Sequence, residues 1–208
     1  DKMEYLILFL PLIASIISGF FGKFLGDRNC EILTSLFVSI SALLSLIIFY
    51  KVVSDGYENN IVITTWINSG SLNVNWSINI DSLSSVMLVV VTLVSSLVHI
   101  YSIGYMAHDP HKTRFMSYLS LFTFAMLTLV TSDNFIQLFF GWEGVGLCSY
   151  FLIGFWFKKP SANAAAIKAF LVNRVGDFGF ALGIFLVFYL FGTVNYTEVF
   201  QQIPTIID

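Results

Sequence analysis

Charged residues and cysteines are both scarce in this chain. Of its 208 residues only 11% are Asp, Glu, Lys or Arg, whereas 57% are apolar and 22 are Phe. A soluble domain has about a quarter of its residues charged, because polar side chains must cover its surface. The composition therefore excludes a soluble globular protein and indicates a membrane protein.

Positive charge is too sparse for a nucleic-acid partner. Ten Lys and Arg stand against 13 Asp and Glu, which gives a formal net charge of -3 at pH 7. No basic block interleaved with aromatic residues is present to contact a phosphate backbone. We expect no nucleic acid among the partners.

The two cysteines, Cys30 and Cys148, lie far apart in the sequence. They form neither a CxxC pair nor a zinc-binding spacing, and they provide no disulfide framework. We expect no metal site and no redox centre here. Any redox chemistry would therefore need another chain.

Long apolar runs occur at six places. About 20 helical residues cover the ~30 Å of bilayer hydrocarbon, and a helix satisfies its own backbone hydrogen bonds in lipid. The first run follows Glu4 rather than a basic segment, so we expect it to stay in the membrane rather than be cleaved as a signal peptide. The sequence predicts an all-α polytopic membrane protein with six transmembrane helices, at approximately residues 5–22, 32–50, 82–106, 114–131, 134–157 and 165–191.

Basic residues gather in alternate connections between these runs. The connections after the first, third and fifth runs hold seven Lys and Arg, whereas the other side holds only Lys2 and Lys51 together with eight carboxylates. Short loops rich in Lys and Arg stay on the inner side of a membrane. We therefore expect both termini of this sequence on the outer side.

The one long connection, residues 51–80, carries a strand pattern. Apolar and polar residues alternate from Leu72 to Ile80, after a turn signal at Asn68 to Ser71 that follows the apolar segment 61–67. Period-two alternation around such a turn is typical of a hairpin. We predict an outer-side β-hairpin between helices 2 and 3, with one apolar face against membrane or partner. It is either a docking element or a plain surface hairpin.

Glu143 lies near the middle of the fifth predicted helix, among Gly141, Gly144 and Gly146. A carboxylate in hydrocarbon is costly unless it is paired or protonated, and a movable cation can switch it between the two states. We predict that Glu143 is a proton relay. The alternative is a permanently protonated or hydrogen-bonded side chain that only ties helices together. The glycines favour close helix approach and a local bend.

Four further polar residues lie within predicted helices. Arg174 and Asp177 are three residues apart and so share a helix face. Either they compensate each other as a fixed ion pair, or they tune the charge of Glu143 or of a partner subunit. Lys168 is expected to extend to the interface, with proton transfer as the weaker alternative. His99 either relays protons or packs as a hydrogen-bonded core residue.

Two loop features have simpler explanations. Asp81 precedes the third helix and has the form of an N-cap, which accepts amide hydrogen bonds at the positive helix end. His108 and His111 belong to a turn, and we expect neither haem nor metal there.

Three segments, 81–106, 141–150 and 164–177, together resemble one family. They are similar to the largest antiporter-like subunits, subunit L, of proton-pumping NADH:quinone oxidoreductase, respiratory complex I. The resemblance covers nearly the whole chain. It implies a non-redox, membrane-arm subunit that moves protons when quinone is reduced elsewhere in the complex.

The resemblance also implies partners and a location. NADH, FMN, iron–sulfur clusters and quinone are expected on other subunits, with no cofactor in this chain. The expected partners are other membrane-arm subunits, the lipid bilayer and protons. The expected location is the bacterial cytoplasmic membrane or the mitochondrial inner membrane, with the termini on the periplasmic or intermembrane side.

In that family the glutamate that corresponds to Glu143 is paired with a lysine on a seventh span. The resemblance therefore implies that this sequence is an N-terminal fragment, inactive by itself. Residues 1–80 would supply two helices and the hairpin, 81–131 helices 3 and 4, and 132–208 the start of the antiporter-like domain. The alternatives are the large subunit of a multisubunit Na⁺/H⁺ antiporter and a non-transporting assembly or structural remnant.

Overall fold

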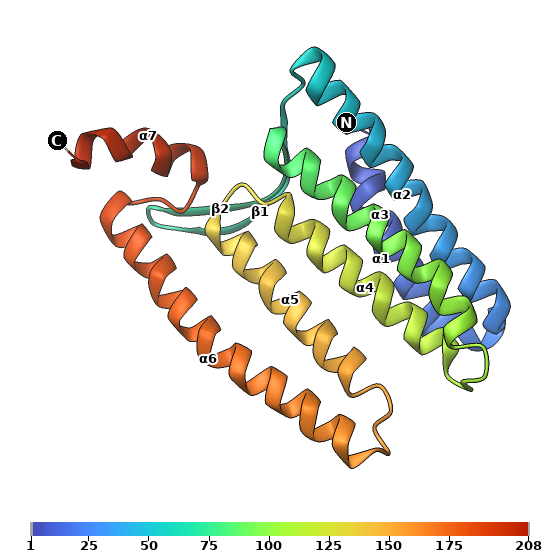
Figure 1. The fold of residues 1–208 in the computed structure, drawn as a ribbon. Coiled ribbons are helices and arrows are strands. Elements are labelled where there is room, and N and C mark those ends of the chain that lie inside the picture. Colours follow the sequence, from blue (N-terminus) through green and yellow to red (C-terminus); the bar gives the residue numbers. More distant parts are fainter. Residues whose placement is uncertain (1, 208) are drawn as a thin grey trace.

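A computed structural model describes residues 2–207 as seven helices and one hairpin (Figure 1). The elements are α1 (Lys2–Leu25), α2 (Asp27–Asp55), β1 (Asn59–Ser69), β2 (Leu72–Ile80), α3 (Ser82–Tyr105), α4 (Lys112–Val130), α5 (Phe135–Ile153), α6 (Pro160–Phe191) and α7 (Tyr196–Ile207).

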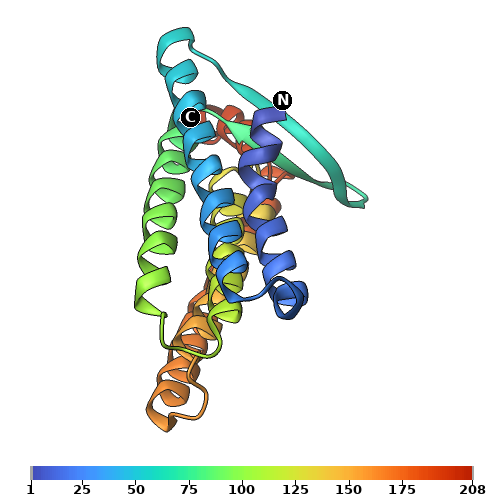
Figure 2. The ribbon, with the colours of Figure 1, turned by 90° about the vertical axis from the view of Figure 1, so that its right-hand side faces the viewer.

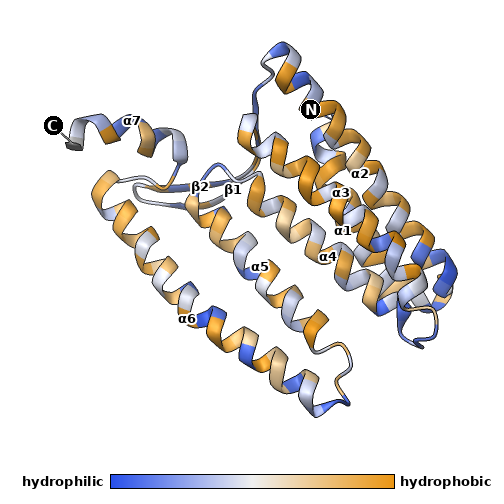
Figure 3. Ribbon diagram, viewed as in Figure 1, coloured by the Kyte–Doolittle hydropathy of each residue, from blue (hydrophilic) through white to orange (hydrophobic). Residues whose placement is uncertain are grey.

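Helices α1 to α6 are long and apolar enough to cross a membrane, which confirms the predicted six spans. Their hydrophilic residues gather mainly at the ends and connections, with a further polar band in the middle of α6 (Figure 3). Helix α6 begins at Pro160 rather than near residue 165. Proline is favoured at the first helical position, because the amide it lacks has no helical partner there.

The first four helices form a bundle, and α5 and α6 continue it as a row (Figure 1). Helix α1 packs against α2 and α4, α3 packs against α2 and α4, and α5 joins α4 to α6. Helix α6 is covered on one side only. The main core cluster lies where Ile7 and Leu8 of α1, Ile48 of α2 and Leu88 of α3 meet the hairpin.

Hydroxyl groups line the contacts within this bundle. Ser15 donates a hydrogen bond to the carbonyl oxygen of Ser117 over 2.9 Å, which joins α1 to α4. The hydroxyl groups of Ser39 and Ser96 lie 2.8 Å apart and join α2 to α3. Small polar residues let membrane helices approach closely. Their hydroxyl groups form hydrogen bonds across the helices, because lipid offers no water as a partner.

The predicted β-hairpin is present between α2 and α3. Strands β1 and β2 pair antiparallel, and Gly70 takes a φ of 61° at the tight turn that joins them. The hairpin crosses the same end of the bundle as the N-terminal end of α1 (Figure 2). Its apolar face packs against the chain's own helices, because Ile78 and Ile80 belong to the main core and Val74 lies in one buried cluster with Ile184 of α6. A contact of the hairpin with membrane or partner stays a prediction.

Helix α7 is not predicted by the sequence analysis. It has only 12 residues and contains Gln201, Gln202 and Pro204, so a search for apolar runs of membrane length does not detect it. It lies beside the C-terminal end of α6, near the hairpin turn (Figure 1).

The connection between α4 and α5 holds this end of the molecule together. The backbone oxygen of Asp133 accepts a hydrogen bond from the amide of Tyr196 over 2.9 Å, and its carboxylate accepts one from Asn60 over 3.1 Å. Asn134 caps α5 and donates to the carbonyl oxygen of Asn75 over 2.8 Å. The hairpin and the start of α7 are therefore both fixed to one short turn.

Candidate proton-relay site

Glu143 and Arg174 form an ion pair between α5 and α6. One guanidinium nitrogen of Arg174 contacts Oε2 of Glu143. The Glu143 side chain is 20% exposed, and its other carboxylate oxygen is buried without a hydrogen-bond partner among the described residues. Glu143 lies close to the midpoint of α5, so this charge pair lies deep in the predicted span.

The pairing differs from the fixed intrahelical pair that the sequence spacing allows. Arg174 reaches across to Glu143, whereas Asp177 accepts a hydrogen bond from the indole nitrogen of Trp142 over 2.8 Å. Asp177 is buried, and it lies one turn beyond Arg174 on α6. Arg174 therefore contacts Glu143 on the neighbouring helix, and its effect on the charge of Glu143 stays a prediction.

Two residues of the site were missed by the sequence reasoning. Trp142 supplies the hydrogen bond to Asp177, and Phe170 supports the guanidinium of Arg174, whose central carbon lies 4.5 Å from the ring centroid. The position of Trp142 beside Glu143 could have indicated its role, because an indole N–H inside a membrane needs a hydrogen-bond acceptor.

Glycines set how closely α5 approaches α4. A Cβ atom on Gly141 would lie 2.7 Å from the Cα of Leu129, and one on Gly144 would lie 3.2 Å from the Cβ of Ala125. The expected close approach is therefore present at these two glycines. A Cβ on Gly146 would meet nothing within 4 Å. The close α4–α5 contact lies directly beside Glu143 in the sequence.

The remaining predicted site residues lie apart from this pair. Lys168 is exposed on α6, and the structure describes no ion pair for it. His99 is fully buried in the first bundle, where Nδ1 lies 2.7 Å from the carbonyl oxygen of Ser95 and Nε2 lies 3.0 Å from the hydroxyl of Ser120. That geometry requires Nδ1 to donate, so Nε2 accepts when the ring is neutral. His99 thus matches a hydrogen-bonded packing residue.

The loop features are also defined. Asp81 caps α3 and forms a reciprocal capping box with Ser84, which confirms the predicted N-cap. Among residues 2–207, no three His, Cys, Asp or Glu side chains gather as metal ligands do. Asp109 accepts hydrogen bonds from the indole of Trp156 over 2.9 Å and from the amide of His111 over 2.7 Å.

The arrangement has a defined chemical capacity. A guanidinium stays protonated under all ordinary conditions, so Arg174 can supply charge but cannot carry a proton. A carboxylate beside a fixed cation favours its ionised form, and the same carboxylate without the cation in a low dielectric favours its protonated form. Glu143 is therefore the group of this pair that can load and release a proton.

Two family models match the chain. Residues 66–116 match the model described as NADH-Ubiquinone oxidoreductase (complex I), chain 5 N-terminus. Residues 132–207 match the model described as NADH:quinone oxidoreductase/Mrp antiporter, TM. These matches place the chain in the class of antiporter-like membrane subunits.

Proteins similar to this chain are named as chain 5 or subunit L of NADH oxidoreductases. The chain is 58% identical over 198 residues to NADH-ubiquinone oxidoreductase chain 5 of Triticum aestivum, covering 95% of this chain and 30% of that protein. It is 55% identical over 202 residues to NADH-quinone oxidoreductase subunit L of Rickettsia felis, covering 97% of this chain and 31% of that protein. The chain belongs to the chain 5/subunit L family of NADH:quinone oxidoreductases, and it spans about a third of the length of these relatives.

Solved structures share the fold. A chain of the membrane-bound sulfane sulfur reductase, an archaeal respiratory membrane complex, superposes with a TM-score of 0.81 at 19% identity, over 96% of this chain and 39% of that one. A chain of the Mrp complex from Dietzia sp. DQ12-45-1b superposes with a TM-score of 0.78 at 22% identity, over 94% of this chain and 20% of that one. The six-helix fold with its hairpin is thus common to several membrane complexes.

Proposed function

We propose that this chain is part of a membrane-arm subunit of NADH:quinone oxidoreductase and takes part in proton translocation coupled to quinone reduction. The observation that carries the proposal is the Glu143–Arg174 pair in the middle of α5 and α6. Intramembrane ionisable residues are costly and usually mark ion paths. Family membership supports the same function.

In the proposed mechanism Glu143 is the proton carrier. While Arg174 contacts Oε2, the carboxylate is stabilised in its ionised form. Withdrawal of the guanidinium leaves a desolvated carboxylate, which takes up a proton. Asp177, one turn further along α6, offers a second acceptor for the displaced guanidinium.

The electron-transfer groups would lie elsewhere. We propose that NADH, FMN, the iron–sulfur clusters and quinone bind other subunits, and that this chain acts as a non-redox part of the translocase together with neighbouring membrane subunits. The proposed host is a bacterial cytoplasmic or mitochondrial inner membrane. The hairpin end of the molecule would face the outer side, because six of the basic residues lie at the opposite end, at Lys23, Arg28, Lys112, Arg114, Lys158 and Lys159.

A second candidate is the large subunit of a multisubunit Na⁺/H⁺ antiporter, which the fold of the Mrp complex favours. A native gel of gently solubilised source membranes separates the candidates when the lane is probed for this chain and stained for NADH oxidation. Comigration with a very large NADH-oxidising band is the expected result. A smaller band without that activity would favour the antiporter, and a chain that runs alone would favour an assembly or structural remnant.

A further inference from the structure

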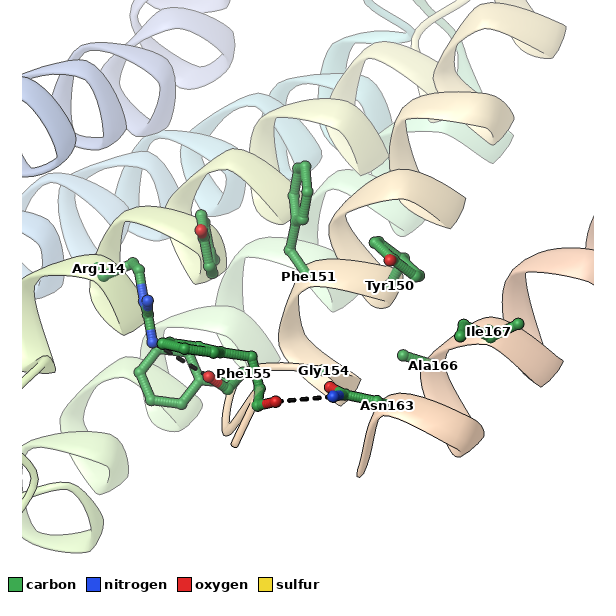
Figure 4. Close-up of a pocket in the computed structure, with 10 residues that line it drawn as sticks. Arg114, Tyr150, Phe151, Gly154, Phe155, Asn163, Ala166 and Ile167 are labelled. Atoms are coloured by element: carbon green, nitrogen blue, oxygen red, sulfur yellow. Dashed lines mark hydrogen bonds between the residues drawn. The ribbon is translucent and has the colours of Figure 1, made fainter. Parts of the chain in front are cut away.

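A cavity of about 420 Å³ lies between α4, α5 and α6 (Figure 4), beside the α5–α6 connection and so at the end of these helices opposite the hairpin (Figure 1). Its walls are mainly aromatic and apolar, and they include Tyr118, Tyr150, Phe151 and Phe155. The guanidinium of Arg114 points toward Phe155 at one side of this space (Figure 4). The cavity therefore combines an apolar interior with one cationic group.

A second hollow, of about 270 Å³, adjoins the first. It is lined mainly by apolar side chains that include Pro110 and Trp156, with the charged residues Asp109, Lys158 and Lys159 of the two connections among them. Arg114, Phe155 and Phe157 line both spaces, which places Arg114 at their common wall. We refer to the two spaces together as the Arg114 double hollow. Apolar and aromatic walls with basic residues at one end fit an amphipathic ligand.

Arg114 has unused hydrogen-bonding capacity in this position. It donates one hydrogen bond, to the carbonyl oxygen of Phe155 over 3.0 Å, and its Nε is buried without a partner among the described residues. Its central carbon lies 4.5 Å from the Phe155 ring centroid and 5.3 Å from that of Phe157. A guanidinium has five donors in a planar fork that suits phosphate oxygens.

The charge around Arg114 favours an anion. Asp109 is the carboxylate that lines the second hollow, and both of its oxygens already accept hydrogen bonds, from Trp156 and from the amide of His111. Lys158 and Lys159 line the same space, and Nζ of Lys159 lies 4.7 Å from the Trp156 ring centroid. Three cations thus line this space together with His111 and one carboxylate, which is already hydrogen-bonded.

The position of the double hollow along the helices also suits an anionic lipid. It lies where α4 begins and where α5 passes into α6, so its charged residues lie at the ends of the helices and its aromatic part extends between the helices. Basic pockets between membrane helices on the inner side bind anionic lipid headgroups, and aromatic residues concentrate at the same level.

We propose that the Arg114 double hollow binds one anionic phospholipid, with its phosphate on Arg114 and Lys159 and part of an acyl chain in the aromatic cavity. A free inorganic anion would leave the aromatic cavity unused, and an uncharged lipid would leave the unpaired guanidinium donors without an acceptor. The proposal does not depend on the relay function of Glu143.

The test uses delipidated full-length protein in neutral detergent and native mass spectrometry of retained lipid. The probes are dioleoyl phosphatidylglycerol, dioleoyl phosphatidylcholine and soluble glycerol phosphate. We expect preference for phosphatidylglycerol over phosphatidylcholine by about tenfold, lost in Arg114→Gln. Lys23→Gln, an exposed cation at the same end, is the matched control and should keep the preference.

Several outcomes would overturn the proposal. These are equal retention of the two lipids, an unchanged preference in Arg114→Gln, or displacement of the lipid by glycerol phosphate at equal concentration, which would indicate an anion site alone. Arg114→Lys, which keeps the charge without the planar fork, should retain part of the preference. If Arg114→Gln does not fold, the double variant Lys158→Gln/Lys159→Gln tests the proposal instead. It should lose most of the preference for phosphatidylglycerol.

Discussion

The side-chain amide of Gln137 on α5 exchanges two hydrogen bonds with the backbone of Ser77 on β2. The Ser77 amide donates to Oε1 over 2.9 Å, and Nε2 donates to the Ser77 carbonyl oxygen over 2.8 Å. Both residues are fully buried, so no water replaces these contacts. Gln137 therefore acts toward β2 as the backbone of a third strand would.

Replacing Gln137 by Leu should destabilise the protein strongly. Two buried backbone groups of Ser77 would lose their partners, and each such loss costs about 1–3 kcal/mol. We expect the free energy of unfolding in detergent to fall by about 2–4 kcal/mol. The control is Gln201→Leu on the exposed face of α7. Equal stability of the two variants would show that the Gln137 contacts contribute nothing.

The two glycines that flank Glu143 at positions 141 and 146 should differ in their tolerance of a methyl group. Gly141→Ala places a Cβ 2.7 Å from the Leu129 Cα, whereas Gly146→Ala meets nothing within 4 Å. Overpacking of a close contact costs about 1–3 kcal/mol, so Gly141→Ala should unfold at lower denaturant concentration and Gly146→Ala should not. A similar loss in both would contradict the close α4–α5 approach.

Glu143→Gln in the full-length protein should remove proton pumping while NADH oxidation by the complex persists in part. Positioned acid–base groups accelerate proton transfer by about 10²–10⁴-fold, so a neutral amide should nearly abolish the relay. Pumping is measured as acidification per NADH oxidised in proteoliposomes. Glu58→Gln, on the exposed connection before β1, is the matched control. Unchanged pumping in Glu143→Gln would refute the assignment.

The loop between α3 and α4 should keep its structure in acid. Burial raises the pKa of the Asp109 carboxyl, but the hydrogen bonds from Trp156 and His111 outweigh it and lower the pKa below 3.8. A lowered folded-state pKa gives stability that is present above 3.8 and is lost as the pH falls through the folded-state value. Tryptophan emission should therefore change only below 3.8 in the wild type. Asp109→Asn should lack that change, and a transition near pH 5 would contradict the shift.

Impermeant maleimide labelling checks the predicted sidedness. In a background without Cys30 and Cys148, Glu58→Cys should react in vesicles that expose the outer face, and Lys158→Cys only in inverted vesicles. The reason is the concentration of basic residues at the Lys158 end. Labelling of Lys158→Cys from the outer face would reverse the orientation.

The sequence predicted the spans well because length and apolarity alone determine which segments can enter a bilayer. It also predicted the hairpin and the Asp81 cap, since both depend on residues close together in the chain. It could not decide the partner of Arg174. Asp177 was within reach on the same helix, but the choice of Glu143 depends on how α5 packs against α6.

The features that were missed depend on distant contacts. Asp133 and Asn134 look like an ordinary turn, yet they hydrogen-bond to the hairpin and to α7 through residues that lie 59 to 73 positions away in the sequence. The face that the hairpin presents to α6 likewise follows from tertiary packing around Val74. The periodicity of apolar residues and the amino-acid composition carry no information about such distant contacts.

The two halves of this molecule differ in how an electric field acts on them. Helices α1 to α4 are joined within the bundle by neutral hydroxyl groups, whereas α5 and α6 meet through a carboxylate and a guanidinium. A membrane potential does work only on charge that moves through it, about 2.3 kcal/mol per elementary charge per 100 mV. In the proposed mechanism a transmembrane voltage would therefore act on the Glu143–Arg174 contact, with the hydroxyl-joined bundle as the stationary part against which that contact moves.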